Sequence, residues 1–292
     1  MKKNKENLGV FLIIVSAFAY ALMPIFSINA LKSGTAVSTL LFTRFSLAAL
    51  FLWAYILIKK VPYKTSVKNL LYIIIIGLLG FTVASVSIYT AYKYISGSVA
   101  TLILFTHPIF VMIFDKILMK HKTTKKKIIA IILTTFGLVL VLYVKEPLNI
   151  KGIVFSFISS ITYGAYCLGL SEKNTQKLSG VVVTAYVATV TMTATALQCL
   201  YDAVPLIPTT SDAIYSAVLL ALISTILASI TFYEGLSIIG PSSATLISSV
   251  EPMFVVIFSA LFLHEVMTIN TIIGGLIIIL GIIILEFEQL TT

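Results

Sequence analysis

Runs of about 20 apolar residues recur along the whole chain, with short polar joints between them. A helix of this length crosses a hydrocarbon core about 30 Å thick. The runs are continuous rather than alternating, so we expect helices and not a β-barrel. Ten runs are predicted, at residues 9–31, 37–58, 69–91, 97–118, 126–144, 152–170, 179–200, 213–236, 241–263 and 268–286.

The amino-acid composition is typical of a chain that folds in a lipid bilayer. Hydrophobic residues make up 59% of the 292 residues and charged residues 11%, whereas a soluble domain carries about 25% charged residues. The first run follows three lysines, as in a secretory signal, but no small-residue cleavage site follows it, which favours a first span. We therefore expect an all-α integral membrane protein that packs against the lipid bilayer, with no length left for a soluble domain.

Lysines are distributed unevenly between the joints, and short cytoplasmic loops collect positive charge. Fifteen lysines fall in the N-terminal tail and in the joints after the second, fourth and sixth runs, against four on the other face. This bias predicts a multi-pass protein of the cell inner (cytoplasmic) membrane with both termini in the cytoplasm. The net charge of +9 then reflects topology, and no nucleic-acid partner is predicted.

The chain repeats itself. Shifting it by 144 residues brings ASVSIYTAYKYISGSVATLILFTHPIFVMIF, from Ala84, onto ASITFYEGLSIIGPSSATLISSVEPMFVVIF, from Ala228. The shift pairs polar and proline positions in order: Ser85 with Ser229, Tyr89 with Tyr233 and Pro108 with Pro252. A shift of 143 pairs Gly9 with Gly152, Ser16 with Ser159 and Tyr20 with Tyr163. We predict two five-span repeats, 1–148 and 149–292.

Five spans are an odd number, so the second repeat would enter the membrane upside down relative to the first. Two packings related by this inversion open to opposite sides, and a site between them near the midplane can be exposed alternately. The repeat therefore predicts ten transmembrane helices, arranged as two inverted five-helix repeats around a central cavity.

Arg44 stands near the start of the second run, in LLFTRFSLAAL, and the chain closes with the pattern EPMFVVIFSALFLHEVMTINTIIGGLIIILGIIIL from Glu251. On these residues, and on its ten predicted spans in two halves, the chain resembles the EamA-type branch of the drug/metabolite transporter superfamily. The resemblance covers residues 8 to about 287. It implies a basket in which spans 1 to 4 and 6 to 9 surround the cavity. The first half departs from the pattern, because Lys120 and His121 stand where the second half has His264 and Glu265.

Glu251 and Pro252 lie in the middle of the ninth run. An ionised carboxylate at that depth costs several kcal/mol unless it faces water, a partner or a proton, so we expect it to line the cavity and bind substrate. The alternative is a protonated carboxyl that bonds Ser248 and holds two helices together. Pro252 removes a backbone donor and is expected to kink the span.

Two further ionisable side chains are candidate substrate-binding residues. The repeat equivalent of Glu251 is His107, and an acid and an imidazole at equivalent depths could pass a proton, which makes protons a candidate coupling ion. The alternative for His107 is an ordinary buried hydrogen-bonding role. Arg44 could hold a substrate carboxylate by two hydrogen bonds, or pair structurally with an acid. For Glu234, near the end of the eighth run, reaching the interface is the favoured interpretation.

Serine and tyrosine share faces of several runs. Ser16 and Tyr20 are four residues apart, hence on one face of a helix, and Ser159 and Tyr163 repeat the pattern. Such a face suits a substrate with an apolar body and a few polar groups, although small residues also pack helices in lipid. The predicted lining residues are Tyr20, Tyr163, Tyr89, Tyr233, Ser85 and Ser229.

The sequence contains no Walker loop, no paired carboxylates and no histidine cluster with metal-ligand spacing. We therefore predict no enzyme activity, no cofactor and no metal, and we interpret Cys167 and Cys199 as packing residues. The leading hypothesis is a secondary transporter that exports a small-molecule substrate, such as an amino acid or an amphipathic cation, by alternating access. An uncoupled facilitator or channel is the alternative. A non-transporting receptor is disfavoured because it needs no inverted repeat. Substrate identity and oligomeric state stay open.

Overall fold

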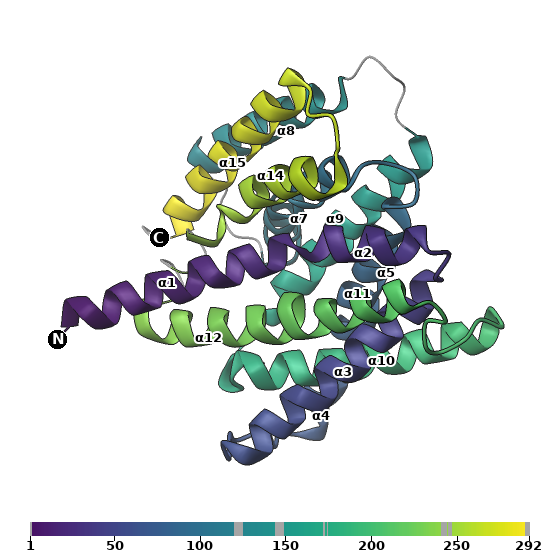
Figure 1. The fold of residues 1–292 in the computed structure, drawn as a ribbon. Coiled ribbons are helices and arrows are strands. Elements are labelled where there is room, and N and C mark those ends of the chain that lie inside the picture. Colours follow the sequence, from purple (N-terminus) through teal and green to yellow (C-terminus); the bar gives the residue numbers. More distant parts are fainter. Residues whose placement is uncertain are drawn as a thin grey trace.

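The computed structural model describes residues 2–119, 125–143, 149–171, 173, 175–240, 244 and 247–289. The described residues are helical throughout, with short joints (Figure 1). The elements are α1 Lys2–Ala21, α2 Met23–Lys32, α3 Val37–Ile58, α4 Val67–Ile76, η1 Gly77–Thr82, α5 Val83–Ala91, α6 Gly97–Leu104, α7 His107–Phe114, η2 Asp115–Met119, α8 Lys125–Leu142, α9 Ile150–Leu170, η3 Thr175–Lys177, α10 Gly180–Tyr201, α11 Ser211–Ala221, η4 Leu222–Leu227, α12 Ala228–Ile239, α14 Glu251–Leu263 and α15 Ile269–Gln289.

Seven helical segments are long and apolar enough to cross a membrane. They are Lys5–Lys32, Val37–Ile58, Val67–Ala91, Gly97–Ile117, Ile150–Leu170, Gly180–Tyr201 and Ser211–Ile239. The apolar helices Ile128–Leu142, Glu251–Leu263 and Ile269–Ile284 are shorter. The all-helical, multi-pass character is therefore confirmed, while the count of ten spans stays a prediction.

Prolines interrupt three of the predicted spans near their middles. The first span breaks at Leu22, and α2 carries Pro24 in its first turn. The fourth breaks between α6 and α7, where Pro108 stands in the first turn of α7, and α14 begins at Glu251 with Pro252 in its first turn. The helix restarts at each proline because the missing amide hydrogen costs nothing in a first turn.

Wide π turns interrupt two other spans. η1 joins α4 to α5, and η4 joins α11 to α12. In each, a threonine hydroxyl fills the widened turn by donating to the carbonyl five residues earlier, from Thr82 to Gly77 and from Thr225 to Leu220, both at 3.0 Å. Such turns recur at functional sites, and η4 supplies two groups to the site described below.

Helices of the two halves pack against each other in matching pairs. α1 lies beside α12 (Figure 1), and α5 packs against α9. A methyl group on Gly9 would come within 2.6 Å of the Ile239 side chain, and one on Gly152 within 2.7 Å of the Ile95 side chain. Because small residues let helices approach closely in lipid, these glycines allow the two seams.

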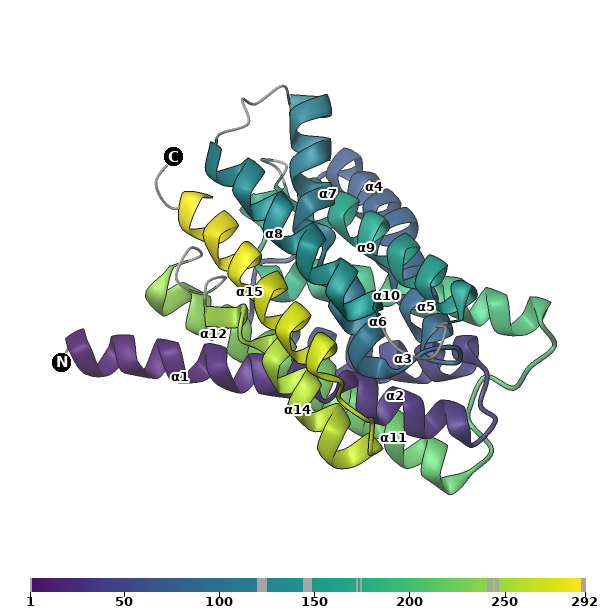
Figure 2. The same ribbon diagram turned by 90° about the horizontal axis from the view of Figure 1, so that it is seen from above.

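The helices α8 and α15 run side by side at one flank of the bundle (Figures 1 and 2). Their backbones approach closely at Gly137 and Gly274, where a methyl group on Gly137 would lie 2.6 Å from the Gly274 carbonyl oxygen. The start of α1 and the end of α15 lie at the same end of the molecule (Figure 2).

Candidate functional site: a polar and aromatic cavity between the halves

A cavity of about 410 Å³ lies between the two halves. Helices from both halves line it, among them α1, α3, α5, α7, α9, α12 and α14. All nine residues proposed from the sequence for substrate binding lie on its wall: Glu251, His107, Tyr20, Tyr163, Tyr89, Tyr233, Ser85, Ser229 and Arg44. The structure therefore brings the candidate residues together, and substrate binding by them stays a proposal.

Glu251 reaches the cavity from the first turn of α14. The residue as a whole is half-buried, and its carboxyl makes no hydrogen bond to any residue that the structure describes. The Ser248 hydroxyl donates instead to the Ala244 carbonyl oxygen at 2.9 Å, so it does not bond Glu251 here. A carboxyl group at this depth thus faces the cavity without a neutralising neighbour in the described part of the chain.

His107 reaches the cavity from the first turn of α7, the equivalent place in the other half. Its Nδ1 lies 3.2 Å from the Leu104 carbonyl oxygen, which can only accept, so Nδ1 carries a hydrogen and Nε2 accepts when the ring is neutral. The ring meets the Tyr163 ring edge to face, with centroids 4.8 Å apart. The imidazole is therefore held in one orientation.

Arg44, only 4% exposed, joins the two halves. Its Nε donates to the Thr225 hydroxyl at 2.8 Å, and its Nη2 donates to the Ser224 carbonyl oxygen at 3.4 Å, both on η4. Its Nη1 donates to the Tyr89 hydroxyl and, at 3.2 Å, to the Met23 sulfur. These bonds engage most donors of the guanidinium. None of the partners is a carboxylate, so the charge of Arg44 is not paired by an acid among the described residues.

The guanidinium also packs on aromatic rings. Its central carbon lies 4.9 Å from the centre of the Phe45 ring and 5.8 Å from that of Tyr89, distances at which a cation is attracted to a ring face. These contacts help to hold Arg44 in place. Of the two interpretations made from the sequence, a structural role has contacts in its favour, although its partners are not acids.

The remaining tyrosines hold defined positions on the wall. The Tyr20 hydroxyl lies 3.0 Å from the Ser229 hydroxyl, and the Tyr233 hydroxyl lies 3.0 Å from that of Thr184. The first bond joins α1 to α12, in different halves, and the second joins α10 to α12 within the second half. Their hydroxyls are thus partly occupied, and both residues line the cavity.

The charged groups of the wall are not duplicated by the repeat. Val187 is the equivalent of Arg44, and His107 that of Glu251, and all four line the cavity. One half therefore supplies the fixed positive charge and the other supplies the acid. A site with this polarity can orient a ligand that carries a charge at one end.

The sequence interpretation missed several lining residues. Tyr166 lies three residues after Tyr163, on the same helical face, so helical spacing alone could have found it. Phe81, Phe105 and Phe232 give no signal in a chain so rich in phenylalanine. Thr225 lines the cavity and bonds Arg44 because of the π turn, whose presence the apolar pattern does not reveal.

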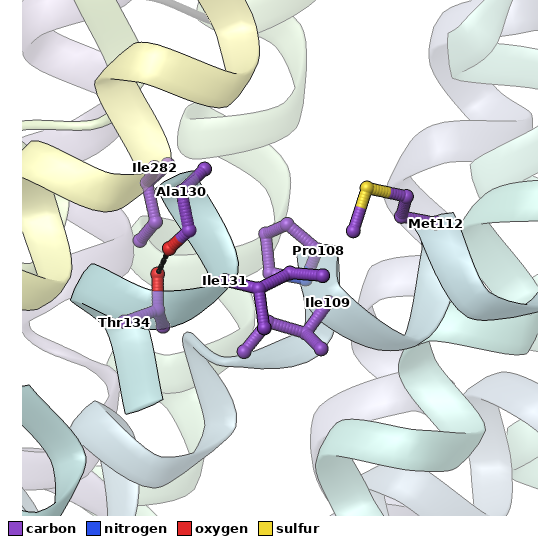
Figure 3. A pocket seen from close by; sticks show the side chains of 7 residues that line it. All are labelled: Pro108, Ile109, Met112, Ala130, Ile131, Thr134 and Ile282. Atoms are coloured by element: carbon purple, nitrogen blue, oxygen red, sulfur yellow. Dashed lines mark hydrogen bonds between the residues drawn. The ribbon is translucent and has the colours of Figure 1, made fainter. Parts of the chain in front are cut away.

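Glu234 does not line the cavity and accepts a hydrogen bond of 3.2 Å from the Tyr55 hydroxyl at the surface. A second gap, of only about 10 Å³, lies between α7, α8 and α15. Figure 3 shows its wall of mainly apolar side chains, and the Thr134 hydroxyl there donates to the Ala130 carbonyl oxygen at 2.8 Å. A gap of this size holds about one water at most, so it is a packing defect.

A helical, multi-pass bundle with a buried polar and aromatic cavity defines a membrane protein of the transporter class. The description of the EamA-like transporter family matches the chain twice, at residues 7–143 and 150–287. The chain belongs to the EamA-like transporter family, within the drug/metabolite transporter superfamily.

Proteins that are similar to this chain over most of its length are also named as transporters. An uncharacterized transporter of Archaeoglobus fulgidus is 27% identical over 258 residues, covering 82% of this chain and 85% of its own. The uncharacterized transporter YcbK of Bacillus subtilis is 25% identical over 307 residues, covering 100% of this chain and 96% of its own. One solved crystal structure superposes with a TM-score of 0.68 over 100% of both chains at 14% identity, which shows a shared fold.

Proposed function

We propose that this protein is a secondary transporter that exports small metabolites, amino acids or amphipathic and cationic compounds, across the cytoplasmic membrane by alternating access. The observation that carries the proposal is the cavity of about 410 Å³ on whose wall all nine candidate residues lie together. Its volume suits a small molecule, and its mixture of rings with a few polar groups suits a ligand that is partly apolar.

Alternating access needs two related packings, and paired contacts support an inverted repeat of residues 1–148 and 149–292. The Ser16 hydroxyl donates to the Ala228 carbonyl oxygen at 2.8 Å, and the equivalent Ser159 donates to the equivalent Ala84 at 2.8 Å. The glycine contacts of Gly9 and Gly152 are paired in the same way. Two seams with the same chemistry can exchange their detailed packing with little change in free energy.

Proton coupling is the mechanism that we favour. The Glu251 carboxyl faces the cavity without a partner among the described residues, so it is free to exchange a proton or to meet a cationic group. His107 presents one acceptor nitrogen at the equivalent place in the other half. A group that binds either a proton or a substrate cation, and not both, would couple the transport of substrate to the transport of protons.

The test uses purified protein in proteoliposomes, with a substrate selected by comparing the metabolites released by cells with and without the protein. A coupled carrier exchanges labelled for unlabelled substrate and accumulates substrate when a pH gradient is imposed. An uncoupled facilitator lets substrate equilibrate without any response to the gradient. Absence of any flux for the released metabolites would refute the transport proposal.

A further inference from the structure

The carboxylate of Glu265, outside the cavity, joins two helices that are far apart in the sequence. Its Oε1 accepts a hydrogen bond from the backbone N–H of Gly97 at 2.6 Å. Its Oε2 accepts from the N–H of Ser98 at 3.2 Å and from the Ser98 hydroxyl at 2.6 Å. Gly97 and Ser98 form the first turn of α6, whose amides have no partner within the helix. A negative charge there also interacts favourably with the helix dipole.

The local chain geometry aims Glu265 at α6. Helix α14 ends at Leu263, and His264 adopts a left-handed conformation with φ of 55°. The N–H of Glu265 then bonds back to the Ser259 carbonyl oxygen at 3.2 Å, which closes the helix end. Helix α2 packs closely against the first turn of α6, because a methyl group on Gly97 would lie 2.7 Å from the Ile28 side chain.

The end of the bundle that contains this contact is sealed more tightly than the opposite end. Ile88, Tyr92 and Ile95 are 3%, 6% and 7% exposed. Their repeat equivalents, Phe232, Leu236 and Ile239, are all only half-buried. Equivalent positions have equivalent surroundings in a symmetric structure, so the difference shows that the α6 end is packed more tightly than the opposite end in this structure.

The sequence does not allow the same contact at the opposite end. The repeat equivalent of Glu265 is His121, and those of Gly97 and Ser98 are Pro241 and Ser242, all outside the described residues. Proline has no amide hydrogen to donate, and a histidine cannot accept three hydrogen bonds. The sequence therefore allows the Glu265 contact at the α6 end only.

We infer that Glu265 is a positioning residue of the transport cycle: its carboxylate holds the first turn of α6 and keeps that end of the cavity closed, and the contact breaks when that end opens. The inference rests on the proposed alternating access. It requires that weakening the contact shifts the population toward the state that opens at the α6 end.

The experiment compares two reporter cysteines at equivalent positions of the repeats. Ile88→Cys and Phe232→Cys, which both line the cavity, are placed separately in a full-length protein whose Cys167 and Cys199 are replaced. A maleimide labels each purified protein in detergent, so access from both ends is allowed and no substrate is needed. In the parent protein we expect the cysteine at 88 to be labelled more slowly than the one at 232.

Glu265→Ala should raise the labelling rate at position 88 by about fivefold and lower the rate at 232, because the two reporters follow opposite states. Ser98→Ala, which removes one of the three donors, should produce a smaller change in the same directions. The matched control is Glu234→Ala, a surface carboxylate outside the cavity, which should leave both rates unchanged.

A rate at position 88 within about twofold of the parent would overturn the inference. So would a parallel rise at both positions with a lower melting temperature, because the contact would then only stabilise the fold, and so would an equal response to Glu234→Ala. The labelling does not depend on transport, so the inference about Glu265 and the transport proposal can fail separately.

Discussion

Ser16 on α1 donates a hydrogen bond of 2.8 Å to the backbone carbonyl oxygen of Ala228 on α12, a residue 212 positions further along the chain. The equivalent pair, Ser159 and Ala84, makes the same bond at the same distance. Both hydroxyls are buried and both bonds join one half of the chain to the other. The two halves are therefore joined by the same hydrogen bond at two equivalent helix contacts, α1 with α12 and α5 with α9.

We expect Ser16→Ala and Ser159→Ala to lower the stability of the detergent-solubilised protein by similar amounts, about 1 kcal/mol each, the typical net contribution of one hydrogen bond. Thermal unfolding measures the change. Ser171→Ala removes an exposed hydroxyl whose bond is local and serves as the control. A loss confined to one of the two buried serines would contradict the equivalence of the seams.

Transport should fall steeply in Glu251→Gln, which keeps size and hydrogen bonding but cannot change its charge. If Glu251 carries the proton, the variant still exchanges substrate for substrate and loses accumulation driven by a pH gradient. If it binds a substrate cation, both activities drop together. Glu234→Gln, at the surface, is the matched control. Full activity with unchanged pH dependence would show that the acid at 251 is structural.

Arg44→Lys should destabilise the protein by about 2 kcal/mol, because an ammonium group cannot reproduce the directed donors of a guanidinium. Tyr89→Phe removes only one of the acceptors and should cost about 1 kcal/mol. Chemical or thermal unfolding of both variants checks the order. A Lys variant as stable as the parent would show that the contacts to Thr225 and Ser224 contribute little.

Alanine at Tyr163 should weaken apparent substrate affinity more than it lowers the yield of folded protein, since Tyr163 lines the cavity and its ring packs against that of His107. Concentration dependence of uptake into proteoliposomes gives the affinity. Tyr94→Ala, outside the cavity, is the control. Reduced yield with unchanged transport per folded molecule would make Tyr163 a packing residue.

The proposed topology places the joint around Lys64 in the cytoplasm and the joint around Thr209 outside, and both side chains are exposed. A cysteine at Thr209 should therefore react with an impermeant reagent added to sealed cells, and a cysteine at Lys64 should not. Lysine at the cytoplasmic interface is the physical basis of the expectation. The reverse pattern of labelling would invert the proposed orientation.

The sequence by itself determined the helical, membrane-spanning character, because each apolar run satisfies its own backbone and needs no distant partner. The run predicted at 37–58 coincides with α3, Val37–Ile58, and that at 152–170 differs from α9 by two residues at its start. The repeat also indicated which polar faces converge, since equivalent residues such as Tyr20 and Tyr163 meet the same cavity.

Only the tertiary structure decided how distant groups pair. Arg44 bonds Thr225 across 181 residues because a π turn in the other half presents that hydroxyl, and an apolar pattern does not encode such a turn. Glu265 meets Gly97 across 168 residues because a left-handed residue turns the chain after α14. Span positions follow from local hydrophobicity, whereas hydrogen bonds between helices depend on their relative placement to a fraction of an ångström, which only the packed core defines.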